Sequence, residues 1–388
     1  MNKIRSFAIH IFVLVCFFSQ TSFSSANADV WFEEFASIHQ LDYVVYGRYD
    51  SAKEYISFSN SGVSLVIVQP HEEFILWMED CARDSTKGNW INVIIADTIY
   101  RRIQLRKGKH SYLLTIPSNT KKIITFIKAT EAHVGTVKFY GIESSNFMDR
   151  DTLPSDQHKK YIQFIGNSIT CGYGNRVSIE APPKGKPLTG FHSVNEDAYG
   201  SYAMQTARNL NYAPMLVSFS GRGVYRNFDG DTNETLPKIY DRIHLQKTIS
   251  KVWDHSKQVP DIIVINLGTN DYYGESRNKP LNDSVFVQTY IQFMERLIGY
   301  YPNAKIICTN GSMLNDGWPE GKKCWSRIQT NLEKVQEHFK AKGNTNIYTF
   351  FFEPQSPPYG EDYHPSLATH TKMAEELTTF IRTVVQKK

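Results

Sequence analysis

A serine follows a short apolar run and opens a glycine-rich turn. The run Tyr161–Ile165 leads directly into Gly166-Asn167-Ser168-Ile169-Thr170, and the turn-forming segment 171–174 comes next. A buried strand that stops at a sharp turn would leave the Ser168 hydroxyl protruding at the carboxyl edge of a parallel sheet, where open α/β folds bind substrates. The pattern therefore predicts a nucleophilic serine.

Three further blocks follow along the chain. Val217–Phe219 runs into Ser220-Gly221-Arg222-Gly223, where a bare main-chain N–H could face a ligand. The apolar run Ile262–Leu267 ends in Gly268-Thr269-Asn270-Asp271, and Glu361-Asp362-Tyr363-His364-Pro365 opens a long helical segment. Serine, asparagine and histidine thus occur in order, the first two at expected strand ends.

Together these blocks resemble the SGNH hydrolase pattern, and the residue sequence within each block is similar to that of carbohydrate esterase family 2. This family also carries an N-terminal β-sandwich, and Lys128–Ala132 followed by Gly135–Gly141 is similar to its final strands. The resemblance covers nearly the whole chain that would follow a cleaved leader. It implies an acetyl esterase that acts on plant polysaccharide.

Acyl transfer needs a nucleophile, a base and donors that stabilise the oxyanion. Ser168 is the expected nucleophile. His364 is the expected base, because an imidazole pKa near 6.5 suits proton transfer at neutral pH. The family pattern places the oxyanion donors on the N–H groups of Ser168 and Gly221 and on the side-chain amide of Asn270.

Two acidic residues shortly before His364 are candidates for the acid that would orient its imidazole. Most SGNH hydrolases have an aspartate three residues before the histidine, a position that Glu361 occupies here. The resembled family has its aspartate two residues before, at Asp362, and some members work with serine and histidine alone. Asp362 is favoured, with Glu361 in reserve. Asn167 stands where many relatives have aspartate and can still hydrogen-bond the turn.

Aromatic residues make up 13% of the chain, which suits stacking on sugar rings. Four of them are expected to line a sugar cleft and bind substrate, with ordinary packing or surface exposure as the alternative for each: Tyr173, Tyr225, Trp318 and Tyr363.

The N-terminus reads as a cleavable signal peptide. Lys3 and Arg5 precede the apolar stretch Phe7–Phe18, and Ala26-Asn27-Ala28 precedes Asp29. A membrane anchor is the rival interpretation, but a stretch of about 12 residues is shorter than the ~20 that a spanning helix needs. Residues 1–28 are therefore expected to be removed after Ala28, which gives a secreted or periplasmic product with no membrane partner.

Charge and cysteine usage exclude several other classes of protein. The formal charge of +4 falls to +2 without Lys3 and Arg5, and the basic residues are interspersed with acids, so no nucleic-acid partner is expected. No CxxC or HExxH spacing occurs, and no metal or other cofactor is expected. The four cysteines beyond the leader, Cys81, Cys171, Cys308 and Cys324, are too few for a disulfide scaffold. Cys308 and Cys324 could close a disulfide loop, whereas Cys171 is expected to be a small buried apolar residue.

Two domains are expected. Residues 29–150 form a β-sandwich or jelly roll, because short β-branched and aromatic runs recur about every 8 to 12 residues. These runs are Tyr55–Phe58, Val63–Val68, Phe74–Met78, Ile91–Ile95, Tyr112–Ile116 and Ile123–Ile127. The turn Ser59–Gly62 reads as a hairpin.

Residues 151–388 are expected to form the SGNH hydrolase domain, a flavodoxin-like parallel sheet with helices on both faces, because strand and helix patterns alternate. Beyond the serine block, strands are expected at Met215–Phe219, Ile262–Leu267, Ile306–Cys308 and Ile347–Phe352. Helices are expected at Asp197–Leu210, Leu236–His255, Val285–Tyr300, Ile328–Lys340 and Ser366–Val384.

The expected function is that of a secreted serine esterase that removes acetyl groups from acetylxylan or acetylglucomannan, with a leaning to O-6 that the resemblance implies. A lipase or aryl esterase on the same fold is one rival, although the loops after Ser168, Gly221 and Asn270 are polar and tyrosine-rich rather than apolar. A glycan-binding protein that has lost activity is the other. The sequence leaves the oligomeric state open.

Overall fold

The structure is a computed structural model that describes residues 34–68, 71–84, 86–117, 123–144, 153, 159–180, 190–277 and 279–386. Phe32–Lys388 forms one compact unit. The expected signal peptide, Met1–Ala28, and the expected domain boundary near Arg150 lie outside the described residues.

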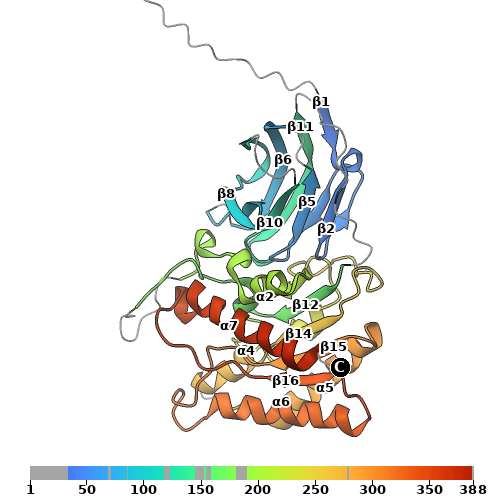
Figure 1. Ribbon diagram of the computed structural model, residues 1–388. Helices are drawn as coiled ribbons and strands as arrows, with labels where there is room; N and C mark the ends of the chain where they lie inside the picture. The colour runs from blue at the N-terminus through green and yellow to red at the C-terminus, as the bar shows by residue number, and fades with distance from the viewer. Residues whose placement is uncertain are drawn as a thin grey trace, which may run out of the picture. The chain divides into compact units, whose positions relative to one another are not determined.

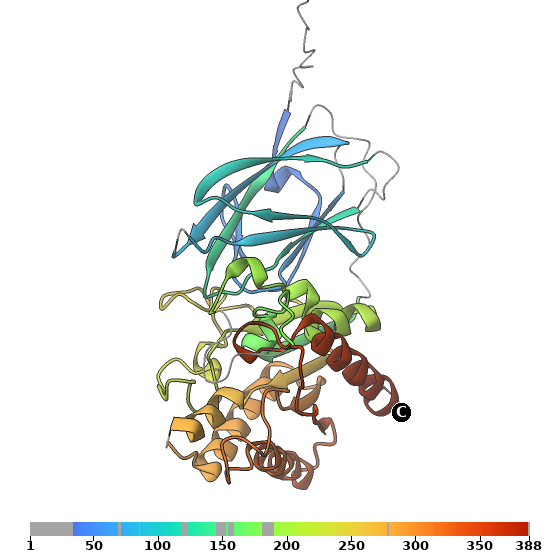
Figure 2. The ribbon, with the colours of Figure 1, turned by 90° about the vertical axis from the view of Figure 1, so that its left-hand side faces the viewer.

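Two antiparallel sheets occupy the N-terminal part of the chain, here called the β region (residues 34–144), and Figure 2 shows them in blue to teal. The first has the spatial order β3 (Asp50–Ser51), β4 (Ile56–Phe58), β11 (Gly135–Ser144), β6 (Glu73–Ala82) and β9 (Gly108–Thr115), with β1 (Glu34–Ser37) paired to β11. The second has the order β2 (Tyr43–Tyr46), β5 (Ser64–Val68), β10 (Ile123–Lys128), β7 (Trp90–Ile95) and β8 (Thr98–Gln104).

The two sheets share one apolar core, which is formed by every second side chain along their strands. Along β6, buried residues alternate strictly with half-buried ones, as expected for a strand with one face on a core. Phe74 and Leu76 from the first sheet pack in the same cluster as Leu65 and Val93 from the second. Antiparallel β structure is thereby confirmed, and the specific jelly-roll connectivity stays a prediction. The arginine-bearing edge strand β8 was not among the expected runs.

The expected hairpin at Ser59–Gly62 is wrong. This turn joins β4 to β5, which belong to different sheets, so it carries the chain from one sheet to the other. Gly62 has φ +73° and donates its N–H to the Lys128 carbonyl at 2.8 Å, so the turn is held against the end of β10 instead of closing a two-stranded ladder.

A five-stranded parallel sheet forms the second part of the fold. Its spatial order is β13 (Ala213–Ser218), β12 (Tyr161–Gly166), β14 (Ile262–Asn266), β15 (Lys305–Thr309) and β16 (Ile347–Phe350), which is 2-1-3-4-5 in chain order. This is the order of a doubly wound sheet of the flavodoxin kind, and its switch point lies beside the first strand.

Helices cover both faces of this sheet (Figure 1). One face packs against α2 (Tyr202–Leu210) and α7 (Leu367–Phe380), which a π-helical turn at Ile381–Val385 extends. The other face packs against α5 (Asp283–Tyr300) and α6 (Cys324–Ala341). The shorter helices are α1 (Ser168–Cys171), α3 (Leu236–Ile239) and α4 (Thr269–Tyr273). Single 3₁₀ turns occur at Ile38–Gln40, Ser193–Asn195, Ala198–Gly200, Gly274–Arg277 and Glu361–Tyr363.

The expected helix at Leu236–His255 is largely wrong, since only its first turn forms, as α3. The fully buried Arg48 of the β region donates hydrogen bonds to the main-chain carbonyls of Tyr240 and Arg242. These carbonyls would be partners within a helix. These two bonds from Nη1 of Arg48 therefore hold the segment in an irregular conformation, with its Trp253 side chain buried.

The possible disulfide between Cys308 and Cys324 is also wrong, because both are free thiols buried in the core. Cys308 lies on β15 with its sulfur 3.5 Å from that of Met294. None of the helices within the described residues is long and apolar enough to cross a bilayer.

Candidate active site

Three neighbouring strands of the parallel sheet end together and carry the three strand-end blocks. Gly166 at the end of β12 lies in register with Ser218 of β13 on one side and Asn266 of β14 on the other. Ser168, Gly221 and Asn270 follow these strand ends within two to four residues, so the strand order alone brings them to one edge. All three line one pocket.

The turn that presents Ser168 depends on glycine. A Cβ at Gly166 would lie 2.0 Å from Oγ1 of Thr170, so a side chain there would push the turn apart. Asn167 caps α1, and its side-chain oxygen accepts the N–H of Ile169 at 3.1 Å. Asparagine thus still bonds the turn, and Ser168 occupies the first helical position.

His364 reaches the serine from the opposite end of the chain. Its Nε2 lies 2.8 Å from Oγ of Ser168, and its Nδ1 lies 3.0 Å from the main-chain oxygen of Glu361. A carbonyl can only accept, so Nδ1 carries the proton and Nε2 is left to accept the Ser168 hydroxyl. The ring also stacks on Tyr173, with centroids 4.1 Å apart. Serine and histidine therefore form a dyad in which the histidine is set to act as base.

Asp362 does not orient the histidine as expected. Its carboxylate accepts the Tyr173 hydroxyl at 2.8 Å and the N–H of Gly190 at 3.0 Å. Asp362 and the next residue, Tyr363, have φ values of 48° and 63°. This left-handed pair turns the backbone so that the carbonyl of Glu361, rather than an acid side chain, faces the imidazole.

The reserve acid, Glu361, is also occupied elsewhere. Its buried carboxylate accepts hydrogen bonds from the His192 ring at 2.8 Å and from the Asn195 amide at 2.6 Å. Its main-chain N–H donates to the Gly174 carbonyl at 3.2 Å, which ties the histidine loop to the turn after Ser168. The side chain of Glu361 thus anchors the loop, and its main chain sets the tautomer.

The expected oxyanion donors lie around the serine. Ser168 is the first residue of a helix, so its N–H has no partner within that helix. Gly221 has φ +78°, and a Cβ there would lie 2.8 Å from the Phe228 ring, so only glycine leaves this main chain unstrained beside the pocket. The Asn270 amide donates one hydrogen to the carbonyl of Arg222 at 2.9 Å, which leaves its second hydrogen for a ligand.

Asp271 holds the loop that carries the glycine donor. Its buried carboxylate accepts the N–H groups of Val224, Tyr225 and Arg226 at 2.7 to 3.0 Å. Burial raises the pKa of Asp271 to about 6, although these three N–H groups act in the opposite direction. The second strand-end loop is thereby tied to the start of α4, which positions Gly221 relative to Asn270.

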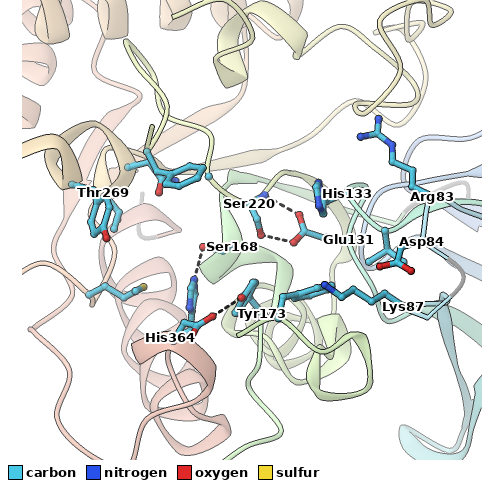
Figure 3. Close-up of a pocket in the computed structure, with 18 of the residues that line it drawn as sticks. Arg83, Asp84, Lys87, Glu131, His133, Ser168, Tyr173, Ser220, Thr269 and His364 are labelled. Carbon is cyan, nitrogen blue, oxygen red and sulfur yellow. Dashed lines mark hydrogen bonds between the residues drawn. The ribbon is translucent and has the colours of Figure 1, made fainter. Parts of the chain in front are cut away.

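A glutamate of the β region also contacts the loop that carries Gly221. Glu131, in the turn between β10 and β11, accepts the N–H of Ser220 at 2.8 Å and also its hydroxyl (Figure 3). The ammonium of Lys128 donates to the Glu131 carbonyl at 3.0 Å. Because Ser220 immediately precedes Gly221, the β region directly supports one of the expected oxyanion donors. Sequence reasoning missed this role, since a single buried glutamate in a strand connection carries no distinctive signal.

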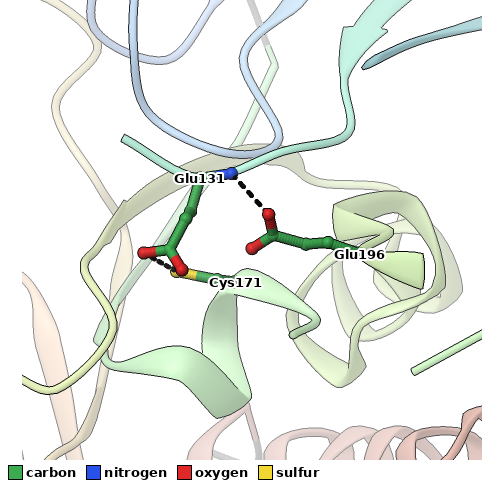
Figure 4. Close-up of side chains that lie close together, drawn as sticks. All are labelled: Glu131, Cys171 and Glu196. Carbon is green, nitrogen blue, oxygen red and sulfur yellow. Dashed lines mark hydrogen bonds between the residues drawn. The ribbon is translucent and has the colours of Figure 1, made fainter. Parts of the chain in front are cut away.

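Glu131 also belongs to a buried group of three potential metal ligands, with Cys171 and Glu196 (Figure 4). Burial raises the pKa of the Cys171 thiol and that of Glu196 well above their ordinary values, and the Glu131 charge adds to both effects. Metal ligands must be deprotonated. The raised pKa values of Cys171 and Glu196 and the nearby Lys128 ammonium therefore oppose the binding of a cation by this cluster.

We expect Glu131→Ala to lower kcat by about 10- to 100-fold, because a donor displaced by about 1 Å costs up to that much. KM should change by less than about twofold, since Glu131 would act through Ser220 and the transition state. Steady-state kinetics on an aryl acetate measure both constants. Glu131→Gln, which keeps one acceptor oxygen, should recover most of the rate, and the exposed Glu54→Ala is the matched control. A wild-type kcat in Glu131→Ala would contradict the positioning role.

The dyad opens into a pocket of about 610 Å³ (Figure 3). Of the four aromatic residues expected to bind substrate, Tyr173 lines it. Tyr225 packs against the core, and Tyr363 is not among the lining residues and lies beside Tyr359, with the two rings tilted by 60°. Trp318 is 56% exposed and lies beside Tyr273, which does line the pocket, with ring centroids 6.4 Å apart. Further lining residues were not anticipated: Phe191, Phe228, Tyr273 and, from the β region, Arg83, Asp84, Lys87 and His133.

The dyad should stay active in mild acid. Burial lowers the pKa of His364 to about 4, although its bond to the Glu361 carbonyl works in the opposite direction. Only the neutral imidazole can take the serine proton, so kcat/KM should hold from pH 7 to about pH 5 and fall as the pH drops through 4. A pH profile on an aryl acetate, with circular dichroism to verify folding at each pH, measures the midpoint. A midpoint near 6.5 would contradict this assignment.

The profile of the GDSL-like lipase/acylhydrolase family matches residues 162–377, a span that contains the strand-end blocks and the histidine. The chain belongs to this family. The Ser-His dyad and the family membership together identify the protein as a serine carboxylic ester hydrolase.

Three relatives of the chain are named as esterases. The cellulase/esterase CelE of Acetivibrio thermocellus is 38% identical over 260 residues, which are 66% of this chain and 29% of CelE. An acetylxylan esterase/glucomannan deacetylase of Cellvibrio japonicus is 28% identical over 85% of both chains. A family two carbohydrate esterase from Clostridium thermocellum, solved in complex with cellohexaose, has a TM-score of 0.76 at 28% identity and covers 89% of this chain and 99% of its own.

Proposed function

We propose that this protein removes acetyl groups from O-acetylated plant polysaccharide, either acetylxylan or acetylglucomannan, with a leaning to the O-6 position. The observation that carries the proposal is the Ser168–His364 dyad at 2.8 Å, opening with the Gly221 and Asn270 donors into one polar-rimmed pocket. The relatives named above, which are carbohydrate esterases, support the same substrate class.

The first half-reaction would acylate the serine. His364 Nε2 takes the Ser168 proton while Oγ attacks the acetyl carbonyl. The negative charge develops on the former carbonyl oxygen, where the N–H groups of Ser168 and Gly221 and the Asn270 amide can donate to it. The C–O bond to the sugar then breaks, and the imidazolium returns its proton to the departing sugar oxygen.

The second half-reaction repeats these steps with water. His364 takes a proton from a water molecule that attacks the acetyl-serine, and the same donors stabilise the second oxyanion. Collapse of this intermediate breaks the bond to Oγ, which regains its proton and releases acetate. The carbonyl of Glu361 holds the imidazole tautomer throughout, and no step requires a cofactor.

The pocket suits a sugar better than a lipid. A lipase needs an apolar tunnel for its acyl chain, whereas this pocket carries charged side chains from the β region, including Arg83, Asp84 and Lys87 (Figure 3). A polysaccharide is too large to enter a cell, so we also propose that the N-terminal segment directs export.

The test is acetate release from acetylated xylan, acetylated glucomannan and an aryl acetate, comparing the wild type with Ser168→Ala. We expect release from at least one polysaccharide, with kcat/KM above that on the aryl ester, and its loss in the variant. Folded wild-type protein that releases no acetate but still binds the polymers would favour glycan binding without catalysis. Release from the aryl acetate alone would favour the aryl esterase.

A further inference from the structure

Positively charged side chains line the pocket from two parts of the fold. Arg83 and Lys87 lie in the segment between β6 and β7 of the β region, and Arg277 lies at the end of the 3₁₀ turn after α4. All three are exposed and line the same pocket as Ser168 and His364. Figure 3 shows Lys87 extending from the β region toward Tyr173, with Arg83 nearby.

The contacts of these side chains leave their charge unneutralised. The Arg83 guanidinium donates to the main-chain carbonyl of Gln246 at 2.6 Å. The Lys87 ammonium lies 5.9 Å from the Phe191 ring, and the Arg277 guanidinium lies 4.9 Å from that of Tyr273. Carbonyls and rings orient a cation without cancelling its charge. Among the described residues, none of the three cations forms an ion pair with a carboxylate.

The acids that line the same pocket are mostly engaged in holding loops. Glu131 is bonded to Ser220, and Asp362 is bonded to Tyr173. Asp84 is the exposed acid of the pocket, and its carboxylate accepts the N–H of Thr86 at 2.9 Å and its hydroxyl at 2.7 Å. The lining as a whole therefore holds three cations and three acids, but all three cations are exposed and only one of the acids, Asp84, is. The exposed part of the lining, here called the rim, thus carries an excess of positive charge.

We propose that this rim binds a carboxylate on the substrate, so that the enzyme acts preferentially on glycans in which a uronic acid lies near the acetylated sugar. Guanidinium and ammonium groups are the side chains that proteins use to bind carboxylates, and an excess of positive charge at the rim also attracts anionic ligands. The inference rests on the proposed esterase function and adds the chemistry of the substrate chain.

The experiment compares two forms of one polymer. A uronic-acid-bearing xylan is prepared unchanged and with its carboxyl groups reduced to alcohols, and both forms are acetylated to the same degree. We expect kcat/KM for acetate release to be about tenfold higher on the carboxylate form at low salt, and this preference to shrink in about 0.5 M salt because exposed charges are screened.

Charge variants identify the residues responsible. Arg83→Gln and Lys87→Gln should each reduce the preference about two- to fivefold, as expected for exposed pairs. Asp84→Asn should increase it, because the variant removes the opposing charge while keeping the shape. Lys334→Gln, an equal change of charge at an exposed position on α6, is the matched control and should leave the preference unchanged.

A binding measurement separates this inference from the esterase proposal. Ser168→Ala protein is titrated with an unacetylated uronate-bearing oligosaccharide and with its carboxyl-reduced counterpart. Equal affinities and equal kcat/KM values on the two polymers would overturn the carboxylate site while leaving the esterase intact. Should neither polymer release acetate, the esterase proposal fails, and a tighter affinity for the carboxylate form would still support the site.

Discussion

Replacing His364 by alanine is expected to lower kcat by roughly a millionfold, because the dyad histidine is the base that lies within reach of Oγ of Ser168. Ser168→Ala should cost about the same, and the double variant should be no worse, since the two side chains act as one unit. Burst and steady-state kinetics on an aryl acetate measure the loss. Independent, additive losses would contradict a shared role.

Replacing Asp362 by asparagine is expected to have a much smaller effect than replacing His364. In a Ser-His-Asp triad, Asp→Asn costs about 10⁴ in kcat because the imidazole loses its tautomer. Here the carbonyl of Glu361 sets the tautomer, so Asp362→Asn should cost less than about tenfold. Asparagine can still accept the Tyr173 hydroxyl, so the loop should keep its conformation. A loss near 10⁴ would make Asp362 the orienting acid after all.

The second large effect is expected at Asn270. Removing its amide in Asn270→Ala should lower kcat by about 10² to 10³, the usual cost of losing one oxyanion donor. KM should change little, because the donor acts on charge that develops only in the transition state. Kinetics on an aryl acetate, which makes few sugar contacts, isolate this effect from glycan binding.

Asn270→Asp is the informative companion variant. Aspartate keeps the shape but replaces the donor with a negative charge beside the oxyanion, so its loss should exceed that of alanine. Asn303→Ala, at an exposed turn after α5, is the control and should leave kcat unchanged. If Asn270→Asp were as active as the wild type, the side chain would not be donating to the oxyanion, and its bond to the Arg222 carbonyl would be its main role.

Most residues at the sheet edge that carries Ser168 could be predicted, because the sequence patterns that indicate them are short and local. Each of Ser168, Gly221 and Asn270 follows a short apolar run whose length and flanking glycines favour a buried strand. The carboxyl ends of parallel strands lie at the same edge of a sheet, so the three blocks are expected to lie close together in a parallel sheet. The helix expected at Leu236–His255 failed because its deciding partner, Arg48, lies about 190 residues away and donates to Tyr240.

The sequence by itself determined most strands and long helices and the identity of the reacting side chains, because strand periodicity, glycine turns and a serine-histidine pair are properties of short segments. Only the tertiary structure decided which group orients His364, because that depends on left-handed backbone at Asp362 and Tyr363, which offers a carbonyl in place of an acid. It also decided what the β region contributes. Glu131 and Ser220 are 89 residues apart, and only the packing of the β region on the parallel sheet brings them into contact.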